Sequence, residues 1–166
     1  MKVVINSCFG GFSLSPLATK RLAELNGREC YFFVMGRKPD GGLDPHALVP
    51  VSVEEAKKAF VWYAYDIPNP NEVLPRTDNW GDMTFEERKA ANDAADSHSV
   101  DHGRCLERHD PKLIQVVEEL GDKANGAHAR LSIVTIPDGT DYEIDEYDGN
   151  EHIAEKHQTW YADSTN

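Results

Sequence analysis

The chain has 166 residues, a length typical of one domain, and 40% of them are hydrophobic. Its 29 acidic and 17 basic residues give a formal net charge of −12, which argues against a surface that neutralises nucleic-acid phosphates. Cys8, Cys30 and Cys105 are too far apart to indicate a disulfide framework or a zinc ribbon. No apolar stretch is long enough to span a bilayer, and the N-terminus does not resemble a signal peptide. We therefore expect an intracellular protein with no membrane partner and no nucleic-acid partner.

The N-terminal third predicts a strand, a loop, a helix and a second strand. Residues 3–5 are β-branched and suit a buried strand, and the paired glycines within residues 6–12 interrupt that pattern. Ser15 is a good N-cap and precedes a proline, so a helix should begin there and end near Asn26. Residues 30–34 read as the second strand. The order is that of a β-loop-α-β unit.

The middle of the chain is less regular, and residues 36–104 read as a polar insertion or lid within one domain spanning 1–166. Residues 37–50 are rich in Gly, Pro and Asp and predict a loop. Residues 61–65 could continue a helix or form a strand.

Two capping boxes predict helices in this middle segment. Ser52 opens a short helix as far as about residue 60. Thr84 opens a polar helix as far as about residue 96, with almost no apolar face. A helix of that kind belongs on the surface.

The C-terminal third is regular again. Asp110 followed by a proline predicts a helix start, and residues 129–136 alternate as a strand does. Residues 148–150 form a turn signal between two strands expected at 142–147 and 151–160. The helix has an apolar stripe made of Leu113, Ile114, Val116, Val117 and Leu120. The fold class predicted is α/β or α+β, with a mixed sheet, the N-terminal β-loop-α-β unit, and a C-terminal helix followed by an antiparallel hairpin.

The first candidate ligand site is the glycine loop before the N-terminal helix. Glycines let backbone approach a ligand closely, and a helix N-terminus favours phosphate. Aromatic rings in the loop could stack on a base. The candidate residues are Asn6, Cys8, Phe9, Gly10, Gly11, Phe12 and Ser13. Alternatively the loop is a tight turn whose phenylalanines fill the core, and Cys8 is a small buried side chain rather than a nucleophile.

Further candidates lie toward the C-terminus. Arg108 has a planar fork that suits phosphate, and Asp110 follows it, although Asp110 could serve only as a helix cap. Glu151, His157 and Trp160 share the hairpin region and could bind a base or do acid–base work. The alternative is an exposed polar strand face.

Four residues have the right chemistry for a metal, namely His98, His102, Cys105 and His109. On a continuous helix they would share one face, but Gly103 and the polar surroundings argue against such a helix. The alternative is solvated loop histidines, and we expect no cofactor. Established hydrolase, zinc-protease and kinase motifs do not occur in the sequence.

Two parts of the chain show a family resemblance. The first is Val3 to Ser15, with Cys8-Phe9-Gly10-Gly11-Phe12 at its centre. The second is a series of short motifs: Arg108-His109-Asp110-Pro111, Val116 to Gly121, Ala124-Asn125-Gly126, Ile136-Pro137-Asp138, Glu146 to Gly149, and His157 to Trp160. Together they resemble a family of small proteins carried by tailed bacteriophages and prophages. The resemblance covers somewhat under half of the chain and leaves out the middle.

That resemblance implies a phage origin and a place in the host bacterial cytoplasm, and it says little about chemistry. Small accessory phage proteins often counter host defences, and one type acts as a sponge for nucleotide second messengers. The leading expectation is therefore a homo-oligomeric protein that sequesters a small phosphorylated nucleotide without changing it. One alternative is an enzyme that degrades such a nucleotide through His157 or the histidine cluster. Another is a protein–protein inhibitor with an acidic, nucleic-acid-like surface.

Overall fold

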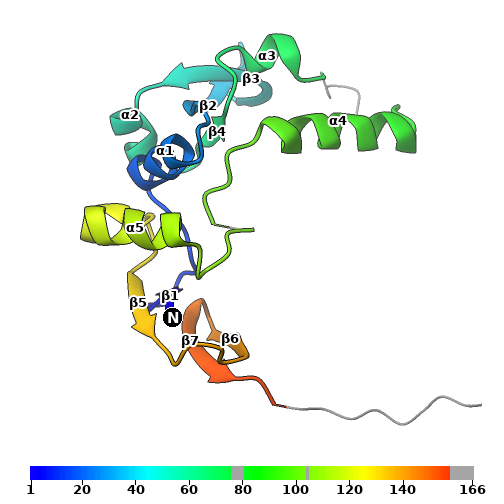
Figure 1. Ribbon diagram of the computed structural model, residues 1–166. Coiled ribbons are helices and arrows are strands. Elements are labelled where there is room, and N and C mark those ends of the chain that lie inside the picture. Colours follow the sequence, from blue (N-terminus) through cyan, green and yellow to red (C-terminus); the bar gives the residue numbers. More distant parts are fainter. Residues whose placement is uncertain (76–80, 104, 158–166) are drawn as a thin grey trace, which may run out of the picture.

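A computed structural model describes residues 1–75, 81–103 and 105–157 (Figure 1). In chain order the elements are β1 (Lys2–Asn6), α1 (Pro16–Leu25), β2 (Tyr31–Arg37), β3 (Leu43–Val51), α2 (Val53–Lys58), β4 (Tyr63–Tyr65), α3 (Pro70–Val73), α4 (Phe85–His98), α5 (Pro111–Leu120), the short 3-10 helix η1 (Gly121–Ala124), β5 (Leu131–Thr135), β6 (Tyr142–Tyr147) and β7 (Asn150–Glu155). Helices combine with antiparallel sheets, which confirms the predicted α/β or α+β class.

Within the described residues the strands form three separate antiparallel sheets, ordered β3-β2-β4, β1-β5 and β6-β7. The predicted strand–helix–strand order at the N-terminus is confirmed. The prediction of a mixed sheet is wrong, because the strands are divided among three sheets and all their pairings are antiparallel. The second edge of β1 has other partners: Val4 N–H donates to the Arg108 carbonyl at 2.8 Å, and Asn6 N–H donates to the Glu151 carboxylate at 2.7 Å. Strand β1 therefore has no edge left for β2.

The predicted loop over residues 37–50 is wrong from Leu43 onward, because β3 begins there. Prolines usually exclude a central strand, but β3 is an edge strand, where they are tolerated. Residues 61–65, left open between helix and strand, contain strand β4, which pairs with the opposite edge of β2. The middle segment thus supplies both outer strands of the largest sheet.

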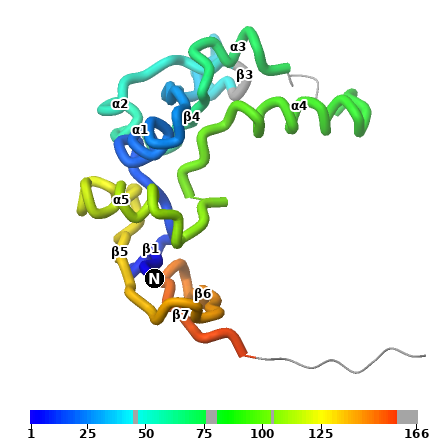
Figure 2. Tube along the Cα trace, viewed as in Figure 1, coloured from blue at the N-terminus to red at the C-terminus, as the bar shows by residue number. Residues whose placement is uncertain are grey.

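One core lies between α1, α5 and β1. Ser15 caps α1 by accepting the Ala18 N–H, and Asp110 caps α5 by accepting the Lys112 N–H. The buried members are Val4, Leu14, Ala18, Leu22, Leu113, Val116, Val117 and Ala124. Strand β1 lies between α5 and the β6–β7 hairpin (Figure 2), which joins this core to the C-terminal part of the chain.

A second core joins α1 and α2 to the β3-β2-β4 sheet. Its buried members are Ala23, Phe32, Ala56, Ala64 and Val100, and Trp62 packs against them. The Phe32 and Trp62 rings meet edge to face with centroids 5.5 Å apart. Since α1 contributes to both cores, it fixes the two halves of the molecule relative to each other.

The three cysteines are free thiols, as their spacing indicates. Burial raises the pKa of the Cys30 thiol to about 12, so this side chain stays protonated at neutral pH. No helix among the described residues is long and apolar enough to cross a membrane.

Helix α4 extends away from the rest of the molecule (Figure 1) and buries only Ala91 among its own residues. Its C-terminal end is held by Asp66, which accepts hydrogen bonds from Arg28 at 2.7 Å and pairs with His98 at 2.9 Å. Burial alone would raise the pKa of Asp66, but the hydrogen bonds from Arg28 and His98 outweigh it and lower the pKa below its usual 3.8.

This lowered pKa predicts a pH dependence of stability. A carboxyl whose pKa is lower in the folded state stabilises the fold above its unfolded pKa, and that contribution is lost as pH falls through the folded pKa. We expect Asp66→Asn to lower the free energy of unfolding by about 2 kcal/mol at pH 7, and this difference to shrink once the pH falls below 3.8. Urea unfolding at pH 7 and pH 3 measures it, with Asp82→Asn, an exposed carboxyl, as control. A difference that stays constant across this range would contradict the assignment.

Candidate functional site

The glycine loop after β1 is organised by Asn6, which is fully buried. The Asn6 amide nitrogen donates to the carbonyl oxygens of Cys8 and Gly149, each at 2.6 Å. Its amide oxygen accepts the Arg130 N–H at 2.7 Å. A single side chain therefore ties together the loop, the hairpin turn and the start of β5.

The glycines of the loop serve close backbone packing. Gly10 has a φ of +121°, and its N–H donates to the Asp148 carbonyl at 3.2 Å. Gly149 in the hairpin turn has a φ of +79°, and a methyl group there would overlap the backbone of Gly11. Two glycine-containing turns thus lie directly against each other, which is the close approach that glycine permits.

The fold brings Arg108, Glu151 and Phe12 into contact. The two guanidinium nitrogens of Arg108 each donate to a different Glu151 oxygen at 3.0 Å. The side chains are only 17% and 9% exposed, and the Arg108 guanidinium carbon lies 3.3 Å from the centre of the Phe12 ring. Arg108, expected to hold a phosphate, is therefore neutralised by Glu151 and stacked on Phe12.

The N-terminus of α1 is also engaged with protein acceptors. Leu14 N–H donates to the His102 carbonyl and Ser15 N–H to the Ala124 carbonyl, each at 2.8 Å. Ala18 N–H donates to the Ser15 hydroxyl at 3.2 Å, and Pro16 has no N–H to offer. These groups hold the start of the helix in place, so these particular donors are not available to a phosphate.

The remaining predicted residues do not join a common site. The Cys8 thiol donates to the Asn6 side chain at 3.4 Å and is part of the loop's own framework. Asp110 caps α5, Phe9 is 63% exposed, and His157 is exposed just beyond β7. Trp160 lies outside the described residues.

The histidines and cysteine considered as metal ligands are separated from one another. His98 pairs with Asp66, and His109 meets the Tyr142 hydroxyl at 2.9 Å. His102 instead packs against an aromatic ring, and helix α4 ends at His98, so the continuous helical face does not form. Among residues 1–75, 81–103 and 105–157, no three His, Cys, Asp or Glu side chains are grouped as a metal site.

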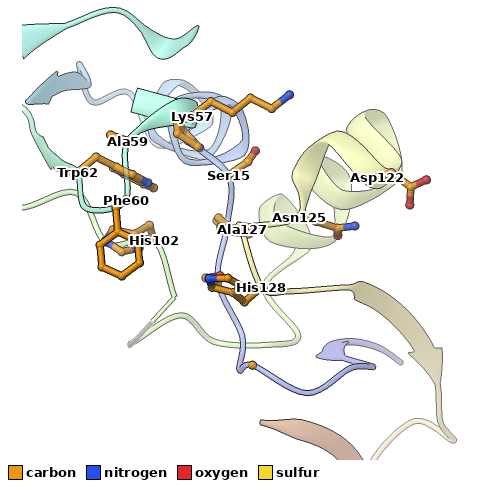
Figure 3. A pocket seen from close by; sticks show the side chains of 15 residues that line it. Ser15, Lys57, Ala59, Phe60, Trp62, His102, Asp122, Asn125, Ala127 and His128 are labelled. Carbon is orange, nitrogen blue, oxygen red and sulfur yellow. The ribbon is translucent and has the colours of Figure 1, made fainter. Parts of the chain in front are cut away.

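A pocket of about 440 Å³ lies beside the N-terminus of α1 (Figure 3). It is bordered by the end of α2, the segment before β4 and the loop before β5. Its lining residues are Gly10, Ser13, Leu14, Ser15, Pro16, Lys57, Ala59, Phe60, Trp62, His102, Asp122, Asn125, Gly126, Ala127 and His128.

One wall of this pocket is aromatic. The Trp62 and His102 rings lie 4.4 Å apart at 41°, and the edge-to-face contact with Phe32 anchors Trp62 in the sheet core. Phe60 stands beside them and is 97% exposed, an unusual state for a phenylalanine next to a cavity. Figure 3 shows Phe60, Trp62 and His102 gathered on one side, with His128 opposite.

The polar lining is sparse. The Ser15 hydroxyl donates to the Lys123 carbonyl at 2.6 Å, and the Asn125 amide oxygen accepts the Leu131 N–H at 2.9 Å, so both are engaged. Lys57 is exposed and forms no ion pair with any residue in the described part of the chain. Asp122 is the acidic member of the lining. The described part of the lining thus offers aromatic rings, one lysine and one aspartate.

Sequence reasoning located only Gly10 and Ser13 of this lining as site residues, and placed His102 in another role. It missed Lys57, Phe60 and Trp62, which follow the Ser52 capping box. The available signal was the spacing of two between Phe60, at the end of the predicted short helix, and Trp62, in the segment left undecided between helix and strand.

Comparison of the chain with family models, with curated proteins and with solved structures finds no match to any of them.

Proposed function

We propose that this protein binds a small phosphorylated nucleotide in the pocket beside α1 and holds it unchanged. The observation that carries this proposal is the aromatic wall of Phe60, Trp62 and His102 in the same cavity as Lys57, which forms no ion pair with the described residues. Aromatic rings stack on any nucleobase, and a lysine ammonium suits a phosphate. The pocket differs from the predicted site, although both include Gly10 and Ser13.

Binding without turnover is the form we favour. The alternative function, an enzyme that degrades the nucleotide, would act through His157 or the histidine cluster. His157 is not in the pocket lining, and His98 and His109 have separate partners elsewhere. Of the cluster, His102 lines the pocket, where its ring packs against Trp62. Arg108 and Glu151, the buried charged pair nearest the glycine loop, are bonded to each other. These arrangements support a binding protein over a catalyst.

The biological role we propose is the sequestration of a host immune signal by a phage protein in the bacterial cytoplasm. The support for this role is the resemblance of the two ends of the chain to phage proteins. We propose in addition that the protein acts as a homo-oligomer.

Phe60→Ala is expected to weaken nucleotide binding by about tenfold, because stacking on one aromatic ring contributes roughly 1–3 kcal/mol per base. The loss should leave folding intact, since Phe60 is 97% exposed. Isothermal titration calorimetry with adenosine and uridine monophosphates measures the effect. Phe85→Ala is the matched control, because Phe85 is 76% exposed on α4 and does not line the pocket. Equal affinities for the two variants would contradict the proposed site.

A further inference from the structure

Resting on the proposed function, we infer that the pocket selects a single nucleotide carrying one phosphate, and discriminates against nucleoside di- and triphosphates and against dinucleotides. Two properties of the pocket carry this selectivity: the balance of charges among its described lining residues and its volume of about 440 Å³.

The fixed charges of the lining cancel. Lys57 supplies one positive charge and Asp122 one negative charge, and no other Lys, Arg, Asp or Glu occurs among the described lining residues. In Figure 3 the Lys57 chain passes above Ser15, on the side of the pocket away from His128, while Asp122 lies beyond Ser15. One phosphate group can approach Lys57, whereas the described lining residues include no second lysine or arginine for a further phosphate.

The surroundings raise the cost of additional negative charge. A phosphate monoester carries roughly −1.5 to −2 charges at pH 7, and each phosphate added to the chain adds more. The protein has a formal net charge of −12, so its overall field opposes anions. Arg108, the cation expected to help, is committed to Glu151.

The volume of the pocket also favours a single nucleotide. Small-molecule pockets span roughly 300–1,000 Å³, and this pocket of about 440 Å³ lies toward the lower end. Trp62 and His102 form one ring pair with centroids 4.4 Å apart, and in Figure 3 Phe60 lies on their side of the pocket with His128 opposite. That arrangement provides one stacking position, and a second base would find no ring of this group.

The test compares adenosine, its mono-, di- and triphosphate, and the matching uridine series by titration calorimetry at pH 7.5 and 0.1 M salt. We expect the monophosphate to bind tightest, with affinity falling about threefold for each further phosphate. The nucleoside should bind about threefold weaker than its monophosphate. Lys57→Gln should remove the advantage of the monophosphate over the nucleoside, while Lys58→Gln, the neighbour on α2 outside the lining, should keep it.

The outcomes separate the two proposals. Triphosphates binding as tightly as monophosphates, or tighter, would overturn the selectivity while leaving nucleotide binding in place. The selectivity would also be overturned if Lys58→Gln removed the affinity advantage of the monophosphate over the nucleoside while Lys57→Gln kept it. If the protein is folded and none of the eight compounds gives a binding heat, both nucleotide binding and the selectivity are overturned.

Discussion

Replacing Glu151 by glutamine is expected to lower the free energy of unfolding by about 3 kcal/mol, because removing one partner of a largely buried ion pair leaves the other charge uncompensated. The Glu151 side chain is 9% exposed. It accepts hydrogen bonds from the two terminal guanidinium nitrogens of Arg108 and from the Asn6 N–H. Glutamine keeps the shape but presents an amide nitrogen to one of these donors. Urea unfolding followed by circular dichroism measures the change.

The control is Glu143→Gln on β6. The Glu143 side chain is exposed and makes no hydrogen bond or ion pair with the described residues. Its replacement should change the free energy of unfolding by no more than about 0.5 kcal/mol. Matching results for Glu151→Gln and Glu143→Gln would mean that the ion pair with Arg108 does not hold the hairpin to β1.

Gly149→Ala is expected to cost about 3 kcal/mol of folding stability, from two separable causes. A non-glycine residue at a φ of +79° is strained by about 1–2 kcal/mol, and the new methyl group would also overlap the backbone of Gly11. The overlap is with main chain, so no side-chain rotation relieves it, and overpacking of this kind costs about 1–3 kcal/mol.

Gly139→Ala isolates the first cause, the backbone strain. Gly139 has a φ of +81°, nearly that of Gly149, yet no atom lies within 4 Å of where its methyl group would be. We expect it to cost about 1 kcal/mol, from strain alone. Thermal unfolding of both variants decides the point. Should Gly139→Ala prove as costly as Gly149→Ala, the close contact between the glycine loop and the hairpin turn would not contribute.

Local sequence signals predicted most of the elements. The Ser15 and Asp110 caps, each followed by a proline, mark the starts of α1 and α5, and the Ser52 and Thr84 capping boxes mark α2 and α4. These signals work because cap and helix are adjacent in sequence. Strand β3 was missed because its prolines are tolerated only at a sheet edge, and being at an edge is a property of the whole sheet.

The candidate site was harder to predict, for a related reason. Asn6, Phe12, Arg108 and Glu151 were singled out and do meet, but their donors and acceptors satisfy one another. Whether a polar residue faces a ligand or another residue depends on partners more than 100 positions away, as with Asn6 and Gly149. The pocket itself combines residues from four separate parts of the chain, so no local motif marks it.

The measurement that tests nucleotide binding most directly is native mass spectrometry of the protein incubated with adenosine monophosphate, followed by denaturation and analysis of the released compound. The wild type and Phe85→Ala should gain the mass of one nucleotide per chain, Phe60→Ala should gain much less, and the released nucleotide should be unaltered. A chemically changed nucleotide would contradict holding without turnover. No mass gain by the folded wild-type protein, with adenosine or uridine monophosphate, would contradict nucleotide binding in the pocket.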